Sequence, residues 1–328
     1  MFRSHTTLTI VFLALLLGAC SHRNANDAEE LRVHFLRLER TLLDSPEDQL
    51  AQNVAAFRDS FPSPLLSLAP EDPLFFEMMQ DYRNDSVMRR VDLFVQKHYG
   101  DLRWLEQELG EALAHAQKLD SNIRFDHFAT FIGSQGYEGR VRADRESKSL
   151  VVAIDQYVAP YLECYGYFGD PLYLVHLSDS AYLATDCIAS IAQEFIAMPK
   201  NLPSLLDYMI AEGKKLYFLE ECLPHLADSI RMRYTAPQMQ WMKDNEAKVW
   251  SYILQNKILF ETDLMRFHNL LDDAPHTNCF GNESAPRTIE YIGWQIVRQY
   301  VKKSNCSLSD LFENTNSQSI LNTANYHP

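Results

Sequence analysis

The stretch Leu150-Val151-Val152-Ala153-Ile154, followed directly by Asp155-Gln156-Tyr157, decides the fold class of this 328-residue chain. A short apolar run rich in β-branched residues and bounded by polar residues is typical of a buried β-strand. A second strand is predicted over Ile123–Phe128, where apolar and polar residues alternate. Elsewhere the apolar residues recur mainly at helical spacing. The sequence therefore predicts a helix-rich α+β protein with a small β-sheet.

Helices are predicted on both sides of the two strands, from apolar spacing and from proline breaks. The segments before the strands are Leu31–Leu43, Gln49–Phe57, Phe75–Met79, Val87–His98 and Leu102–Lys118. The segments after them are Ala181–Ala197, Pro203–Leu219, a helix that starts at a capping box of Thr235 and Gln238 and buries a stripe from Met239 to Leu254, and Thr288–Lys302. No repeat and no linker interrupts the pattern, so residues 31–328 are predicted to form a single domain.

Composition and the absence of known motifs narrow the function classes. The net charge is −14 and basic residues form no block, which argues against nucleic acid as a partner. Five cysteines follow Cys20, widely spaced and without a CxxC pair, which argues against a disulfide framework and a structural zinc site. No GxSxG, Walker A or GxGxxG motif is present. We therefore expect no bound metal and no cofactor.

Residues 1–19 have the features of a bacterial lipoprotein signal peptide. Arg3 and His5 precede an apolar run that is too short to span a bilayer, and this run ends in Leu17-Gly18-Ala19-Cys20. In that pathway the thiol of Cys20 is acylated and the leader is removed, so residues 20–30 are predicted to be a lipid-anchored tether. The acyl chains would hold the protein at a membrane of the cell envelope. Ser21, where inner-membrane lipoproteins commonly carry Asp, favours the outer membrane.

One predicted helix lies where a zinc peptidase of the zincin type carries its HExxH motif. In that register Glu194 takes the place of the general base, and Glu212, on the next helix, that of a third ligand. The two histidine positions hold Gln193 and Ala197, which supply no imidazole. Two interpretations follow: a degenerate zincin-like scaffold in which these four residues form a vestigial cleft, or an unusual hydrolase that uses Glu194 and Glu212. The missing histidines favour the scaffold.

Several segments, in order along the chain, resemble the gliding motility lipoprotein GldB family of Bacteroidetes. They are the lipobox ending at Cys20, Ile154–Tyr157, Ala211–Tyr217, Tyr234-Thr235 with Gln240-Trp241, Asn245-Glu246 with Val249-Trp250, Glu283–Arg287 with Tyr291–Val297, and Asn325–Pro328. The resemblance implies a role in gliding motility and in the coupled export of surface adhesins. It implies no reaction, and it is consistent with a scaffold that lost its metal. It therefore points to a non-catalytic envelope lipoprotein that works through contacts with other envelope or gliding-apparatus proteins.

Trp294 stands out in the helix predicted over Thr288–Lys302. It falls outside the apolar stripe of that helix, whose members are Ile289, Ile292, Ile296 and Tyr300. A tryptophan in this position is either an anchor for a partner protein or a second packing contact, against the helix of Trp241 and Trp250. The first alternative predicts an exposed indole and the second a buried one.

Replacement of the proposed acylation site tests the anchor. The Cys20→Ser protein has no thiol to acylate, so it should leave the membrane fraction or accumulate as an uncut precursor. Metabolic labelling with a palmitate analogue should mark the wild type alone. Equal labelling of Cys20→Ser would rule out Cys20 as the acylated residue.

Overall fold

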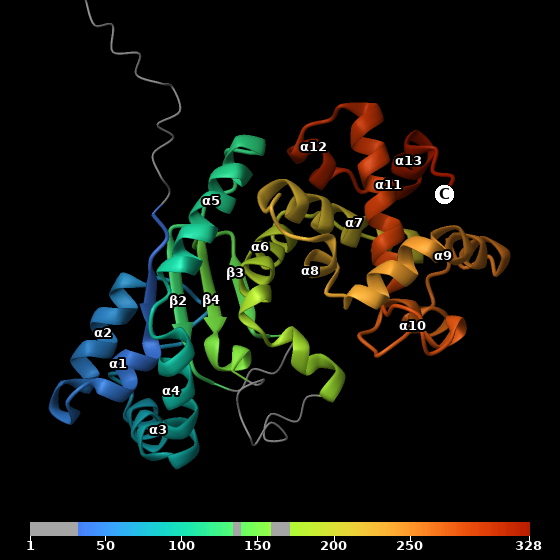
Figure 1. The fold of residues 1–328 in the computed structure, drawn as a ribbon. Helices are drawn as coiled ribbons and strands as arrows, with labels where there is room; N and C mark the ends of the chain where they lie inside the picture. Colours follow the sequence, from blue (N-terminus) through green and yellow to red (C-terminus); the bar gives the residue numbers. More distant parts are fainter. Residues whose placement is uncertain (1–31, 134–138, 159–170) are drawn as a thin grey trace, which may run out of the picture.

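A computed structural model describes residues 32–133, 139–158 and 171–328. A four-stranded sheet of order β1-β2-β4-β3 occupies the N-terminal half, and the C-terminal half is helical (Figure 1). The strands are β1 (Phe35–Arg37), β2 (His127–Phe131), β3 (Val141–Asp144) and β4 (Ser149–Ala153). β2 lies parallel to both β1 and β4, and β3 runs antiparallel to β4. The predicted fold class, helix-rich α+β with a small sheet, is confirmed.

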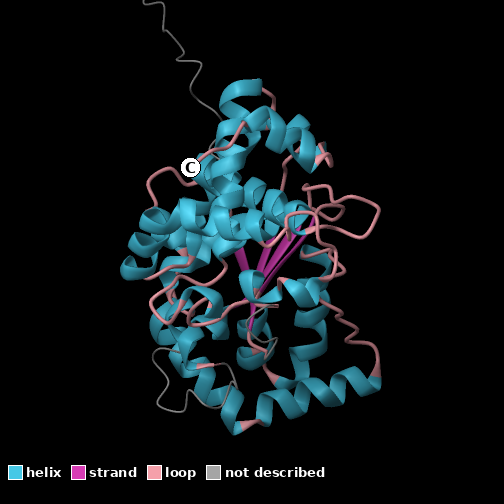
Figure 2. Ribbon diagram, turned by 90° about the vertical axis from the view of Figure 1, so that its right-hand side faces the viewer, coloured by secondary structure: helices cyan, strands magenta, loops and turns pink. Residues whose placement is uncertain are grey.

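Helices surround the strands, as the view in Figure 2 shows. The helices before β2 are α1 (Leu38–Asp44), α2 (Leu50–Ser60), α3 (Pro73–Asn84), α4 (Ser86–Tyr99) and α5 (Arg103–Leu119). The helices after β4 are α6 (Leu183–Gln193), α7 (Leu205–Cys222), α8 (Asp228–Met232), α9 (Ala236–Gln255), α10 (His268–Leu271), α11 (Thr288–Ser304), α12 (Leu308–Glu313) and α13 (Ser317–Ala324). Within the described ranges, no helix has the length and apolar character that a membrane crossing requires.

The central strand β4 is buried on both faces, which explains its unbroken apolar run. Leu150 and Val152 join the main core, which also takes in residues of α5, α6, α7 and α11. Val151 and Ala153 point to the opposite face and pack with residues of α1 and α2. Successive side chains of a strand point to opposite faces of the sheet, so the residues of β4 contribute to two hydrophobic cores.

One strand prediction needs correction, and two strands of the sheet were not predicted. The apolar residues from Leu31 were expected to begin a helix, but Phe35 lies in β1, where it pairs with Phe128 of β2, and the helix begins at Leu38. The strand predicted over Ile123–Phe128 begins at His127 instead, although Ile123 and Phe125 are buried in the core before the chain joins the sheet. β3 escaped prediction because its sequence, Val-Arg-Ala-Asp, has no apolar run, as suits a half-exposed edge strand.

The helix predictions are mostly confirmed, with two corrections. The capping box of Thr235 and Gln238 starts α9 as expected. Leu254, predicted to belong to the buried stripe of α9, is 47% exposed. The helix expected to reach Ala197 ends at Gln193, and the Ala197 N–H donates to the carbonyl of Phe312 instead of continuing the helix.

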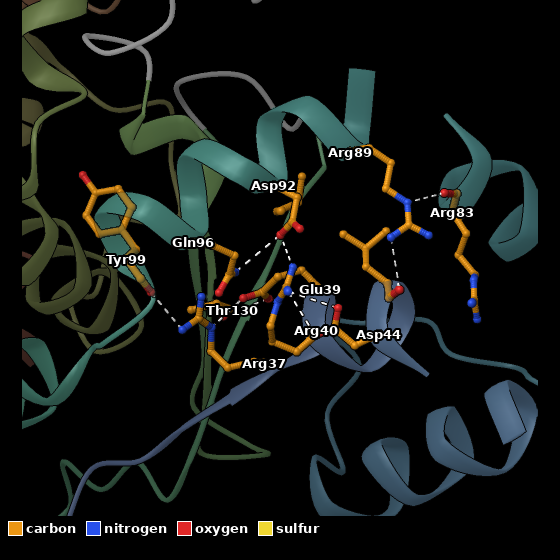
Figure 3. A network of polar contacts seen from close by, with 12 residues as sticks. Arg37, Glu39, Arg40, Asp44, Arg83, Arg89, Asp92, Gln96, Tyr99 and Thr130 are labelled. Carbon is orange, nitrogen blue, oxygen red and sulfur yellow. Dashed lines mark hydrogen bonds and ion pairs between the residues drawn. The ribbon is translucent and has the colours of Figure 1, made fainter. Parts of the chain in front are cut away.

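A buried ionic network fastens β1 and α1 to the rest of the domain (Figure 3). The carboxylate of Glu39 is fully buried and accepts hydrogen bonds from Thr130 Oγ1 of β2, at 3.0 and 3.1 Å, and from Arg37 Nε at 2.5 Å. Arg40, one residue further along α1, forms an ion pair with Asp92 of α4. A buried carboxylate needs partners of this kind, because an unpaired one would be expensive to desolvate.

The backbones of α7 and α11 approach closely at two glycines. A Cβ atom added to Gly213 would lie 2.3 Å from the carbonyl oxygen of Gly293, and one added to Gly293 would lie 1.8 Å from that of Met209. Neither separation is sterically allowed. Both glycines are therefore required by the contact between the helices.

A Gly293→Ala substitution should destabilise the protein by about 1–3 kcal/mol or more, because the methyl group must push α7 and α11 apart. At an exposed helical site the same change would stabilise by up to about 1 kcal/mol, so the sign of the effect is diagnostic. Chemical denaturation of the purified protein measures this change in the free energy of unfolding. Lys302→Ala, at an exposed site of the same helix, is the control and should stay within about 0.5 kcal/mol of the wild type. Equal stability of Gly293→Ala and the wild type would show that the helices do not meet at this glycine.

Candidate functional site

A cavity of about 860 Å³ lies between the sheet and the C-terminal helices. Its wall is formed by residues of α6, α7 and α8, of β3 and its preceding turn, and of the start of α11. Cationic side chains of the described residues that line it are Arg140, Lys215, Arg231, Arg233 and Arg287. The lining carboxylates are Asp186, Asp272, Asp273 and Glu290. Such a concentration of charge is unusual for an interior surface, and it makes the cavity the candidate functional site.

Asp186, in the first turn of α6, is the centre of this charge cluster. Its carboxylate pairs with Arg140 at 2.6 Å and with Arg233, and it accepts a hydrogen bond of 2.6 Å from the hydroxyl of Tyr157. Burial raises the pKa of Asp186, but the two guanidinium groups outweigh this effect, so its pKa falls below the usual value and it stays ionised. One carboxylate thus serves two guanidinium groups.

Arg287 forms a second part of the wall, directly before α11. Its guanidinium pairs with Asp273 at 3.1 Å and donates to the carbonyl of Met232 at 2.7 Å. Tyr234, buried beneath it, donates its hydroxyl hydrogen to the carbonyl of Pro286 at 2.7 Å. Arg287 therefore holds the turn after α8 against the start of α11, through its Nη2 atom and its ion pair with Asp273.

Thr185, Arg231 and Arg287 of the wall each have a buried side-chain atom without a hydrogen-bond partner among the described residues. The hydroxyl of Thr185, a residue 1% exposed, has no hydrogen-bond partner among the described residues. The same is true of Arg231 Nε, although the rest of that guanidinium binds Asp228 and the carbonyl of Leu223. Buried polar atoms in native proteins normally have partners, so each exception asks for an explanation.

The four residues of the predicted vestigial cleft do not assemble as a zinc site would. Gln193 lines the cavity, but it is the last residue of α6, so Glu194 and Ala197 lie beyond the helix. Glu194 accepts the N–H of Arg145, whereas Glu212 pairs with Lys215. No three His, Cys, Asp or Glu side chains of the described segments are grouped as a metal ion would need. The structure therefore gives no support to a zincin-like scaffold, which requires one helix through all five positions of the motif.

Trp294 is buried, which contradicts the prediction of an exposed anchor. Its indole has no exposed surface, and its Nε1 donates to Glu220 of α7 at 3.0 Å. The Arg298 guanidinium lies 3.7 Å from the ring centre and pairs with the same carboxylate. The second alternative, a packing contact, describes this environment, and the hydrogen-bond partner of the indole lies on α7.

Sequence reasoning missed the arginines of the cavity, because they are scattered over more than 140 positions of the chain. Two signals pointed toward them. Ile154–Tyr157 and Glu283–Arg287 were noted as family landmarks without a chemical role. Arg287, at the end of the second segment, lines the cavity, and Tyr157, at the end of the first, donates to the lining residue Asp186.

Asp155, in the short 3₁₀ helix Ile154–Tyr157 after β4, is a buried carboxyl with weak hydrogen-bond support. It is 2% exposed, and it accepts only long hydrogen bonds, from the Gly133 N–H at 3.3 Å and from Gln156 Nε2 at 3.4 Å. Burial raises its pKa from 3.8 to about 6. The folded protein therefore holds this proton more tightly than the unfolded chain does.

The stability of the protein should depend on pH through Asp155. Protonation favours the folded state, so this contribution is present below about pH 4 and is lost as the pH rises through 6. The loss is on the order of 3 kcal/mol. In Asp155→Asn the side chain stays neutral, so the free energy of unfolding of the variant minus that of the wild type should rise by about this amount between pH 4 and 6.5. Denaturation of both proteins across this range measures the difference, and a flat difference would contradict the raised pKa.

The fold and the site define a helix-rich α+β protein with a cavity whose wall is built from ion-paired arginines. The chain matches the family model described as "Gliding motility protein GldB" over residues 20–328, and it belongs to that family. No curated protein and no solved structure matches the chain. Cys20, where the family match begins, lies outside the described residues, as do the predicted signal peptide and tether.

Proposed function

We propose that this protein is a lipid-anchored component of the cell envelope that supports gliding motility, and the associated export of surface proteins, through contacts with other envelope proteins. The observation that carries the proposal is the family match over residues 20–328. It takes in the whole chain that would remain after removal of the leader. The proposed role is therefore attached to residues 20–328 as a whole and not to one segment of them.

The start of the match supports the anchor. It begins at Cys20, the residue that the lipobox marks for acylation. The described chain starts a dozen residues later, and its first strand is held by α5: Glu106 accepts the Phe35 N–H at 2.9 Å and lies 3.0 Å from His34 Nδ1. The tether would thus join the folded domain at a well-fixed point. We place the anchor in the outer membrane, on the basis of Ser21.

We further propose that the protein acts without catalysing a reaction. Glu194, the residue in the position of the general base, lies past the end of α6 and is engaged by the backbone of Arg145. Glu212 is engaged by Lys215 in the same helix. The two carboxylates are engaged by different structural partners. This supports a non-catalytic protein and not a hydrolase that uses Glu194 and Glu212 together.

Complementation of a deletion strain in a gliding host tests both parts of the proposal. Glu194→Gln and Glu212→Gln keep the shape of each side chain and remove its charge, so both should restore colony spreading to the wild-type level. Cys20→Ser, at matched abundance, should restore little or none. Loss of spreading in Glu194→Gln, with normal abundance and melting, would contradict the non-catalytic role. In the same strain, crosslinking in whole cells should capture envelope proteins with the wild type, and capture of none would contradict the role through protein contacts.

A further inference from the structure

We propose that a patch of exposed apolar side chains in the helical half inserts into the headgroup layer of a lipid bilayer. The members of this apolar patch are Leu202, Leu254, Phe260, Leu264 and Met265. The patch itself is an observation on the folded chain. The choice of lipid as its partner rests in part on the anchor proposed at Cys20.

Hydrogen bonds bring the apolar patch together from two segments of the chain. The N–H of Leu205, at the start of α7, donates to the Glu261 carbonyl at 2.9 Å, and the next N–H donates to the Leu259 carbonyl at the same distance. Leu202 therefore belongs to the same surface as Phe260, and the other three members flank Phe260 in the chain. Figure 1 places α9 and α10, the helices before and after this segment, at the outer edge of the helical half. Five of the ten exposed large apolar side chains of the described residues thus share one surface.

The segment between α9 and α10 is held firmly, so its apolar side chains are presented by a fixed backbone. Phe267, near its end, is fully buried, and its ring centre lies 6.2 Å from that of Tyr208 in α7. Asp263 accepts the Met265 N–H at 3.1 Å and caps a short 3₁₀ helix. Met265 is nevertheless 75% exposed. A contiguous apolar surface on a fixed structure marks a contact with a protein or a membrane.

The segments that carry the apolar patch are electrically neutral, in a chain of net charge −14. Residues 198–207 and 254–268 contain three cationic and three anionic side chains, with His268 neutral. They are Lys200, Lys257 and Arg266 against Asp207, Glu261 and Asp263. An anionic bilayer repels the acidic remainder of the protein, so a neutral surface approaches lipid at the least cost. Lys200 and Lys257 are exposed, and their apolar stems suit the boundary between headgroups and acyl chains.

The composition of the apolar patch favours lipid over a protein partner. Three of its five members are leucine, and none is tryptophan or tyrosine. Hot spots of protein interfaces are instead rich in Trp, Tyr and Arg and poor in Leu. Leucine, methionine and phenylalanine side chains gain from lipid by burial alone, without a shaped pocket on the other side.

The proposed anchor would hold the apolar patch near lipid. The chain from Cys20 to Arg32, where the described residues begin, spans at most about 40 Å when fully extended. A tether of this reach corresponds to an effective concentration of about a millimolar. A weak affinity of the patch for lipid therefore suffices to orient the anchored domain on the membrane. Without the tether, the same affinity does not retain the protein in a washed membrane fraction.

Flotation of purified protein with phosphatidylcholine vesicles tests the inference. Residues 20–328 carrying Cys20→Ser cannot be acylated, so binding at millimolar lipid would come from the folded chain. Adding Phe260→Ser and Met265→Ser should weaken this binding about tenfold or more, because two exposed apolar side chains are lost. Binding of the parent protein should persist at high salt, since it does not depend on charge.

The matched control adds Leu74→Ser and Met78→Ser, two exposed apolar positions of α3 outside the apolar patch, and should bind like the parent protein. Absence of flotation by the parent protein, or equal flotation by the patch variant, would overturn the proposal. A dimer that only the patch variant dissociates, seen by light scattering, would also overturn it and assign the patch to a second copy. Palmitate labelling of Cys20 is an independent readout, so labelling without flotation contradicts this inference and leaves the anchor intact.

Discussion

The direct contact between the backbones of α7 and α11 is the constraint on which the C-terminal half depends. It is possible only because Gly213 and Gly293 have no side chains. With the helices in contact there, Trp294 is buried between them and its Nε1 donates a hydrogen bond to Glu220. On the other side of α7, Lys214 is buried and donates to the carbonyl of Asn314 at 2.7 Å, which fixes the segment after α12. The same two helices contribute Lys215 and Glu290 to the cavity wall. The packing of α7 against α11 therefore determines the shape of this part of the cavity.

The family landmarks in the second half of the chain acquire a common explanation from this arrangement. Each one joins segments that are distant in sequence. Tyr326, near the C-terminus, donates to Glu246 of α9 at 2.6 Å and packs its ring against Trp250. Tyr234 and the Pro286 carbonyl link the start of α9 to the start of α11. These landmark residues mainly hold the C-terminal helices together. Their roles are structural, so no reaction could be inferred from them.

Local patterns predicted the helices well and the sheet only in part. The capping box at Thr235 and the apolar run of β4 are decided by neighbours in sequence, so both were found. β1 is decided by its pairing with β2, some 90 residues away, and a three-residue strand has no periodicity of its own. The burial of Trp294 depends on the glycine contact between two helices, which no stripe on a single helix reveals. The arginines of the cavity could not be predicted from the sequence either, because only the tertiary structure brings them together.

The place of β1 in the sheet has a mechanical consequence. It is an edge strand, and it is the first element after the tether. With the lipid anchor and the protein contacts that we propose, tension between the membrane and a moving partner would enter the domain here. A pull along the strand loads the β1–β2 hydrogen bonds in shear, all at once, whereas a pull across it would open them one by one. Two further hydrogen bonds hold β1 in addition to this short ladder. Glu106 accepts the Phe35 N–H, and Arg37 donates to the carbonyl of Tyr99 at 2.9 Å. The buried ion pairs around Glu39 would thus resist a force that reaches β1 from the proposed anchor.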